Sequence, residues 1–268
     1  MSISKTFSKL EKQGALIAYI TGGDPSPKYT PKICQALIEG GADILEIGIP
    51  FSDPIADGPT IQAADFRALR AGTTPQSIFE IVKEIKKRDN VPIVLLTYYN
   101  ILYKMGVRTF LEKATTYEVD GLIIPDLPIE EAEQYKQIAT NQGIDTIFLV
   151  TPSTSLKRLS EIRSFTSGFL YLVSVFGVTG TRDQLAELTT DTIRRIHPHT
   201  AEKVPLAVGF GISKPEHIKK VMDLGVEGAI VGSAFVKVVE KNLHNSTRLE
   251  KDAYSLACSL KAATLKRV

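Results

Sequence analysis

Glu46 stands in the middle of an apolar run, Ile44–Ile49, that has the composition of a buried strand. A carboxylate in such a place costs several kcal/mol unless a partner or a function compensates for it. Two interpretations are open at this point. Glu46 either faces out of the fold and pairs with a basic helix residue, or it is an acid placed for proton transfer.

The loop after this run favours proton transfer. It is rich in proline, aspartate and glycine and carries Asp57. Pro50, Pro54 and Pro59 stiffen it, so it can hold a second carboxylate near the first. Two acids in different environments can divide the roles of general acid and base.

Other catalytic groups are missing from the apolar runs. None of the runs contains a lysine, which disfavours a Schiff-base aldolase. His197 and His199 form H-P-H near a helix end, where solvated side chains are a better interpretation than a metal pair. His217 lies on a predicted helix. We therefore expect no metal, and carbon–carbon bond cleavage would depend on proton transfer.

Glycines gather at the ends of the last three apolar runs and predict a phosphate site. Backbone N–H groups can approach an anion closely at glycine, and a helix N-terminus adds partial positive charge. The alternative is that these glycines serve only as turns, but three converging groups favour phosphate. The residues are Gly177, Gly180, Gly209, Gly211 and Gly232, with Ser233 opening a helix.

Apolar and aromatic residues near the run ends predict a pocket for a flat aromatic group beside the carboxylates. Each residue alone is more often part of a core. The set is Tyr19, Leu96, Tyr98, Ile123, Leu149, Tyr171 and Phe210.

The elements that must position these residues are near-continuous apolar runs, which are typical of parallel strands buried on both faces. With helices between them they predict a single (β/α)8 barrel domain over residues 1–268, whose active site lies at the carboxyl ends of the strands. A doubly wound open sheet is the alternative fold. The runs are Leu16–Thr21, Ile44–Ile49, Pro92–Thr97, Gly121–Pro125, Thr146–Val150, Phe169–Ser174, Pro205–Gly209 and Gly228–Val231.

Helical patterns separate several of these runs. Thr74 and Pro75 read as an N-cap and a first helical residue. Residues 2–13 predict an additional helix that covers the lower end of the barrel. The other predicted helices are Gln76–Arg88, Phe110–Glu118, Glu130–Asn141, Leu156–Phe165 and Glu216–Leu224.

Composition restricts the class of protein. The chain has 268 residues, 43% hydrophobic residues and a net charge of +2, with no basic block, so nucleic acid is not an expected partner. No run approaches the about 18 apolar residues that a membrane span needs. The two cysteines, Cys34 and Cys258, are far apart, as in reduced proteins. We expect a cytoplasmic protein.

Residues 46–62, E-I-G-I-P-F-S-D-P-I-A-D-G-P-T-I-Q, closely resemble the signature of the tryptophan synthase alpha subunit family. The resemblance extends over nearly the whole chain, in the family's order and at about its spacing. The further motifs are T-G-G-D-P at 21–25, L-L-T-Y-Y-N at 95–100, P-D-L-P at 125–128, G-V-T-G at 177–180, G-F-G-I-S at 209–213 and V-G-S-A at 231–234.

The resemblance implies retro-aldol cleavage of indole-3-glycerol phosphate into indole and glyceraldehyde 3-phosphate. It makes Glu46 the general acid at indole C3 and then the base, and Asp57 the partner of the indole N–H. Tyr171 would lie near Glu46, and Thr179 on a closing loop. The phosphate would be bound by Gly180, Gly211, Gly232 and Ser233.

The same resemblance implies an α2β2 heterotetramer with a tryptophan synthase beta subunit. Pyridoxal phosphate would belong to that beta partner, and this chain would need no cofactor. Ile101 and Phe176 depart from residues common in relatives, beside the site rather than in it. Two rivals stay open: an isomerase or epimerase of a sugar phosphate, and a regulatory barrel that activates a beta partner while turning over poorly.

Overall fold

The structure is a computed structural model that describes residues 2–10, 13–173, 182–201, 203–209 and 211–265. Within helix α9 (Arg182–Thr200), the side chains of residues 182–186 are not among those described. Three predicted site residues, Thr179, Gly180 and Phe210, lie outside the described residues, as does Gly177.

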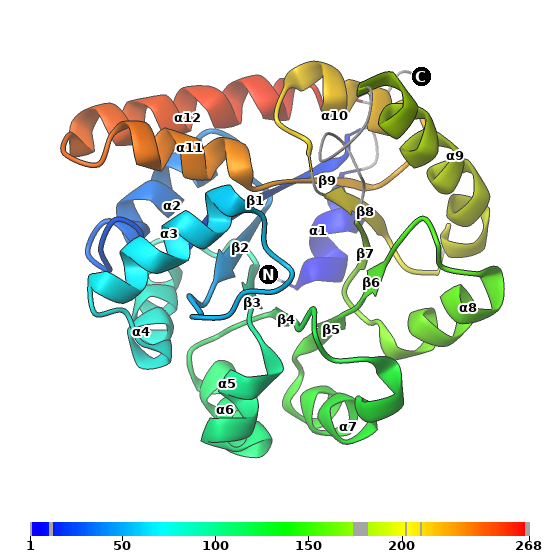
Figure 1. Ribbon diagram of the computed structural model, residues 1–268, viewed down its shortest axis with the longest axis horizontal. Coiled ribbons are helices and arrows are strands. Elements are labelled where there is room, and N and C mark those ends of the chain that lie inside the picture. The colour runs from blue at the N-terminus through cyan, green and yellow to red at the C-terminus, as the bar shows by residue number, and fades with distance from the viewer. Residues whose placement is uncertain (1, 11–12, 174–181, 202, 210, 266–268) are drawn as a thin grey trace.

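A closed barrel of parallel strands forms the centre of the molecule (Figure 1). The sheet order is β5-β4-β3-β2-β1-β9-β8-β7-β6, and every strand pair is parallel. The strands are β1 (Ala15–Thr21), β2 (Ile44–Gly48), β3 (Ile93–Leu96), β4 (Gly121–Ile123), β5 (Asp145–Ile147), β6 (Leu149–Val150), β7 (Leu170–Val173), β8 (Leu206–Gly209) and β9 (Gly228–Val231).

The strands at the two ends of that sheet order, β5 and β6, follow each other directly in the chain. Only Phe148 separates β5 from β6, and its carbonyl accepts a hydrogen bond from the Tyr171 N–H at 3.0 Å. The two short strands thus follow each other as one interrupted strand that closes the barrel. The predicted (β/α)8 barrel is confirmed over the open sheet, and each of the eight apolar runs overlaps a strand.

Both faces of the strands are buried, which explains why the runs are almost continuously apolar. Alternate residues such as Ile17, Ile44 and Val94 meet in a cluster inside the barrel. Their neighbours, such as Leu16 and Leu45, belong to the larger cluster between strands and helices.

Helices surround the strands as an outer layer (Figure 1). Thr74 caps α4 with a capping box, as its sequence indicates, and Gly143 ends α7 in the left-handed region at φ 71°. The helices that follow β1 and β2, α2 and α3, had no predicted range. Besides α9, the helices are α1 (Ile3–Lys9), α2 (Thr30–Glu39), α3 (Pro59–Arg70), α4 (Pro75–Lys86), α5 (Tyr99–Met105), α6 (Val107–Thr116), the 3₁₀ turn η1 (Ile129–Glu131), α7 (Glu133–Gln142), α8 (Leu156–Phe165), α10 (Pro215–Met222), α11 (Ser233–Lys241) and α12 (Ser246–Ala262).

The additional N-terminal helix is confirmed as α1, and it closes the lower end of the barrel. Ile3 is fully buried in the interior cluster together with Ile147 and Phe169. The ring of Phe7 packs 6.1 Å from that of Phe169. Because side chains fill this end, a ligand can enter the barrel interior only from the carboxyl ends of the strands.

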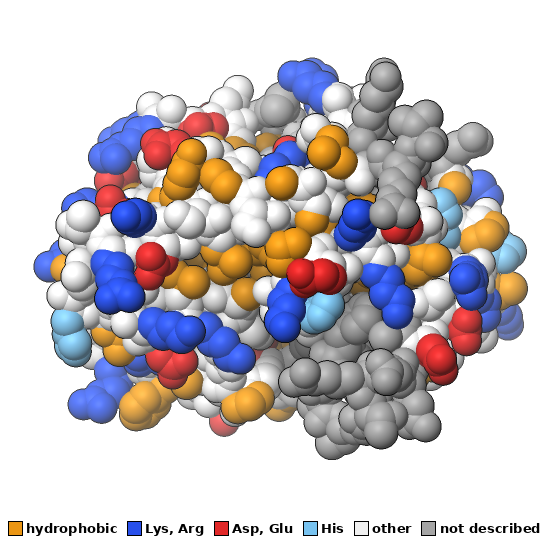
Figure 2. Space-filling model, turned by 90° about the horizontal axis from the view of Figure 1, so that it is seen from above, with side chains coloured by type: hydrophobic (Ala, Val, Ile, Leu, Met, Phe, Trp, Pro, Cys, Tyr) orange, Lys and Arg blue, Asp and Glu red, His pale blue; other side chains and the backbone are white. Residues whose placement is uncertain are grey.

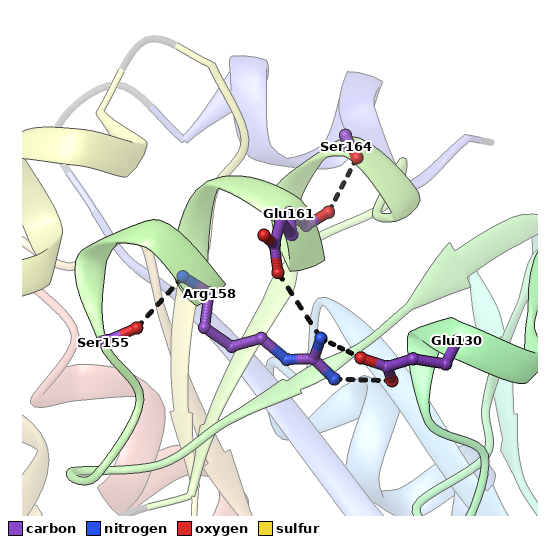
Figure 3. Close-up of polar contacts among 5 residues, drawn as sticks. All are labelled: Glu130, Ser155, Arg158, Glu161 and Ser164. Atoms are coloured by element: carbon purple, nitrogen blue, oxygen red, sulfur yellow. Dashed lines mark hydrogen bonds and ion pairs between the residues drawn. The ribbon is translucent and has the colours of Figure 1, made fainter.

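An exposed ionic cluster connects α8 with the turn after β4 (Figure 3). Arg158 on α8 donates two hydrogen bonds to the Glu130 carboxylate, one of them at 2.8 Å from Nη2 to Oε2. These bonds hold the pKa of Glu130 at about 2, well below its usual range. The Ser155 hydroxyl accepts the Arg158 N–H as the N-cap of α8. The cluster joins the loops that follow β4 and β6.

Candidate active site

Glu46 lies inside the barrel, at the middle residue of β2. It is 1% exposed, and strand pairing aligns it with Tyr19 of β1 and Val94 of β3. Its strand neighbours Leu45 and Ile47 face the helices, so the interpretation that Glu46 faces outward is wrong.

Burial, and secondarily the charge of Asp57, raises the pKa of Glu46 to about 8. Its Oε2 atom accepts no hydrogen bond from any residue that the structure describes. A carboxyl group in these surroundings is neutral at pH 7 and can give up a proton.

Asp57 is held in place by Tyr98, two residues after the end of β3 and the N-cap of α5. The Tyr98 hydroxyl donates to Asp57 Oδ2 at 2.7 Å and accepts the Ala56 N–H at 3.1 Å. The ring of Phe51 stacks on Tyr98 at 5.2 Å between centroids. Burial raises the pKa of Asp57, while the Tyr98 hydrogen bond opposes that rise. Tyr98 was expected only as a pocket wall, and it also positions the second acid.

Two further tyrosines lie next to the acids. Tyr19 and Tyr171 are 4% and 5% exposed, and their pKa values are raised by burial and by neighbouring carboxylates that include Glu46 and Asp57. A Cβ atom at Gly48 would lie 2.4 Å from the Tyr19 hydroxyl oxygen, and one at Gly209 would lie 2.4 Å from that of Tyr171. Glycine at position 209 thus leaves room for the Tyr171 side chain, a role that the sequence did not suggest.

The remaining pocket residues are brought together on the inner face of the barrel. Ile123 is buried in the interior cluster, and the half-buried Leu96 and Leu149 pack against it. Tyr19 and Leu96 also meet Ala64 of α3 in a small cluster. These residues form an apolar wall around the two acids.

The predicted phosphate residues that the structure describes lie at the ends of β8 and β9. Gly211 has φ +77°, in the left-handed region that favours glycine. Gly232 is the N-cap of α11, and no side chain caps this helix. Ser233 is its exposed first residue. The first-turn N–H groups of a helix have no intrahelical partner, so those of α11 can face an anion.

A third buried acid, Asp65 on α3, was missed by the sequence analysis. It is 4% exposed, and burial, followed by the charge of Asp57, raises its pKa to about 8. A signal was present: Asp65 lies in the stripe Ile61, Ala64, Ala68 at helical spacing. Asp24 is also buried, and its carboxylate accepts two hydrogen bonds from Arg67, which lies on α3 like Asp65.

The described residues contain no group of three His, Cys, Asp or Glu side chains that could hold a metal ion. His197 instead lies 3.1 Å from Glu227, Nε2 to Oε1, near the end of α9. None of the helices within the described ranges is long and apolar enough to cross a membrane.

Comparison with known proteins identifies the family. The family model of the tryptophan synthase alpha chain matches residues 6–265. This chain belongs to that family. It is 47% identical to the tryptophan synthase alpha chain of Methanoregula boonei over 97% of both chains, and 46% identical to that of Methanosarcina barkeri over 98% of both.

Solved structures of the tryptophan synthase alpha chain have the same barrel. The alpha subunit of Legionella pneumophila superposes with a TM-score of 0.89 at 33% identity over 98% of both chains. The alpha reaction of tryptophan biosynthesis is a lyase reaction, and tryptophan synthase alpha chains such as this one carry it out. The resemblance seen in the motifs is thereby confirmed.

Proposed function

We propose that the chain cleaves indole-3-glycerol phosphate into indole and glyceraldehyde 3-phosphate, with Glu46 as the acid–base group. The supporting observation is one buried carboxyl group inside the barrel whose pKa is raised to about 8. It is protonated at neutral pH, and a second acid, Asp57, is close enough to affect it.

The reaction uses one carboxyl group twice, first to give a proton and then to take a different one. Glu46 protonates indole C3, which turns the ring into a cationic indolenine that can accept an electron pair. The resulting carboxylate then removes the proton of the side-chain hydroxyl. As the C=O bond forms, the bond from C3 to the side chain breaks and its electrons return to the ring. Indole and the aldehyde leave, and Glu46 is neutral again, so no lysine or metal is needed.

Asp57 has the complementary role of a charged acceptor. The Tyr98 hydroxyl stabilises its carboxylate form through the 2.7 Å hydrogen bond. In this proposal the carboxylate accepts the indole N–H and stabilises the positive charge that develops on the ring. Tyr171 lies beside Glu46, and Tyr19, Leu96, Tyr98, Ile123, Leu149 and Phe210 enclose the indole.

The phosphate is assigned to backbone N–H groups at Gly180, Gly211 and Gly232 and to Ser233, with Thr179 on a loop that closes over the substrate. The left-handed Gly211 and the uncapped first turn of α11 support this assignment. Binding by N–H groups and a helix N-terminus would leave no lysine or arginine essential for the phosphate.

A beta subunit is the proposed partner, in an α2β2 heterotetramer. The alpha subunit of Pyrococcus furiosus, 42% identical over 93% of this chain with a TM-score of 0.86, was solved in a study of mutual activation of its α2β2 complex. In this chain Ile55 of the loop Phe51–Thr60 and Tyr103 of α5 are 82% and 73% exposed, near neighbouring strand ends. Such apolar side chains suit an interface.

The remaining assignments follow from the same proposal. The reaction needs no cofactor in this chain, and pyridoxal phosphate is assigned to the beta partner. The one closed barrel supports a single domain over residues 1–268. Cys34 and Cys258 are both free thiols, which supports a reducing compartment such as the cytoplasm.

The decisive experiment is a steady-state assay of the isolated chain with indole-3-glycerol phosphate, beside Glu46→Gln. The native chain should form indole. The glutamine variant should lose about 10²–10⁴ in rate, since it cannot transfer a proton, while binding substrate nearly normally. If the variant kept more than about a tenth of the native rate, Glu46 would not be the acid–base group.

The same assay separates the two rivals. A sugar-phosphate isomerase or epimerase would act on substrates without indole and form none from this ester. A regulatory barrel would bind the beta subunit while forming indole poorly both alone and in the complex.

A further inference from the structure

Asp65 is a buried acid that the proposed reaction does not use. The buried positions of its helix, α3, are Ala64, Asp65 and Ala68. Ala64 packs with Tyr19 of β1 and Val236 of α11, so this face of α3 covers the carboxyl end of the barrel. An acid among alanines at this place is costly unless it stays neutral.

No cation that the structure describes compensates Asp65. Arg67, on the same helix, is engaged by Asp24 through bonds of 2.8 Å and 2.7 Å, and its Nη1 lies 3.9 Å from Glu240 of α11. The carboxyl groups of Asp57 and Asp24 act on Asp65, and each raises its pKa when charged. With burial, they bring that pKa to about 8.

Polar side chains of β1, Thr21 and Tyr19, lie between Asp65 and the acid pair. The Thr21 hydroxyl favours the charged form of the Asp65 carboxyl group and so opposes the rise in its pKa, and the Tyr19 hydroxyl lies 3.2 Å from Thr21 Oγ1. Tyr19 is aligned with Glu46 in the β1–β2 pairing, and Asp57 and Glu46 both act on its phenol. The path therefore leads from α3 through β1 to the two acids.

We propose that Asp65 is a positioning residue that acts as a neutral carboxylic acid, holding Thr21 and Tyr19 beside Glu46 and Asp57. The inference rests on the proposed roles of those two acids. Like charges at close range cannot both form cheaply. Tyr98 stabilises the carboxylate of Asp57, which therefore takes the charge while Asp65 keeps its proton. Asp57 is then the charged acceptor next to the indole.

Kinetics of two substitutions test the positioning role. Asp65→Asn keeps the volume, the neutrality and the hydrogen-bonding oxygen, so kcat should stay within about threefold of native, well below the loss of a catalytic acid. Asp65→Ala removes the carboxyl group that acts on Thr21 and should lower kcat by about tenfold with KM little changed. The same substitutions at Asp223, an exposed acid after α10, should alter neither.

Carboxyl titration by ¹³C NMR tests neutrality without turnover. Asp65 in the native chain should be protonated at pH 7, and Asp57→Asn should lower its pKa by removing the neighbouring charge. A native chain that forms no indole would overturn the proposed function but not this titration. An ionised Asp65 at pH 7, equal losses in the Asn and Ala variants, or full kcat in Asp65→Ala would each overturn the positioning role.

Discussion

Glu46 and Asp57 are both acids with raised pKa values, yet their surroundings give them opposite tasks. Glu46 has an oxygen without a hydrogen-bond partner among the described residues, and its burial favours the neutral acid. Asp57 accepts a hydrogen bond from Tyr98, which favours the carboxylate. Protonation of indole C3 needs a neutral acid such as Glu46. Stabilisation of the cationic ring needs a carboxylate such as Asp57.

Tyr98→Phe tests the hydroxyl group that donates to Asp57 and accepts the Ala56 N–H. The substitution keeps the ring that stacks on Phe51 and removes only the hydroxyl group. We expect kcat to fall by about tenfold, because Asp57 loses a charge-assisted bond of about 1.5–3 kcal/mol and part of its fixed position. The KM should change less than kcat. Tyr254→Phe on α12 is the matched control, and equal rates in both variants would deny Tyr98 this role.

Glu46→Gln has a second consequence, for stability. The folded state raises the pKa of Glu46 from 4.5 to about 8, so the native protein binds this proton more tightly than the unfolded chain. The associated stabilisation is complete below the unfolded pKa and is lost as pH rises towards 8, by about 1.4 kcal/mol per pH unit.

Glutamine does not titrate, so Glu46→Gln should gain stability over the native protein as pH rises from about 5 to 8. Urea unfolding at several pH values measures this difference. A constant difference across that range would show that Glu46 is not held neutral by the fold.

At the residue scale the sequence predicted the two acids and the inner face of the barrel, but not how they are connected. A lone acid in an apolar run and a stiff loop were enough to single out Glu46 and Asp57. The contact of Tyr98 with Asp57 joins residues 41 positions apart, which periodicity cannot show. The sequence did not indicate Asp65 as a site residue, because a carboxylate on a helix is usually solvated. Only the packing of α3 against the barrel buries the Asp65 side chain.

Elements were predictable where apolar composition is strong. Strands buried on both faces are almost continuously apolar, so each was visible as a run. The break at Phe148 was not visible, because Phe148 is itself apolar and buried. Barrel closure was not visible either, since it depends on pairing between segments far apart in sequence. Helix α3 was read partly as loop because its buried face is mostly alanine.

Gly211→Val tests the loop between β8 and α10 as a phosphate-binding element. Valine is strained at φ +77° and places bulk where the backbone is proposed to approach the anion. We expect calorimetry to show glycerol phosphate binding weakened by about tenfold or more, as for a lost anion contact. The control is Gly143→Val, with similar strain at φ 71° between α7 and the amino end of β5, away from the carboxyl ends of the strands. Equal affinity in the two variants would place the phosphate elsewhere.

At the scale of the whole molecule, charge does not mark the face seen in Figure 2 as a partner-binding surface. Over α10 and α12, acidic and basic side chains are interspersed with hydrophobic ones (Figure 2), in keeping with a net charge of +2. The features that suit an interface lie instead beside the active site. They are the exposed Ile55 and Tyr103, on segments that follow β2 and β3.

The loop Phe51–Thr60 connects that surface with the chemistry. Ile55 is 82% exposed, and Asp57, two residues later, is bound by Tyr98 from within the barrel. A protein that packs on Ile55 therefore also restricts Asp57. Prolines at 50, 54 and 59 limit the entropy that the loop loses on docking. Binding can activate the lyase only if the partner prefers the loop conformation in which Asp57 reaches the substrate.

Titration with the cognate beta subunit should therefore raise the rate of indole formation. A coupling free energy of about 1–3 kcal/mol corresponds to an activation of roughly 5–150-fold. Ile55→Ser, which removes apolar contact area without touching Asp57, should weaken the complex and shift the titration while leaving the isolated chain's rate unchanged. Leu265→Ser, at an exposed leucine near the C-terminus, is the control. A flat titration, with complex formation confirmed by ultracentrifugation, would show that the loop is not coupled to the partner, while the lyase activity of the isolated chain would still stand.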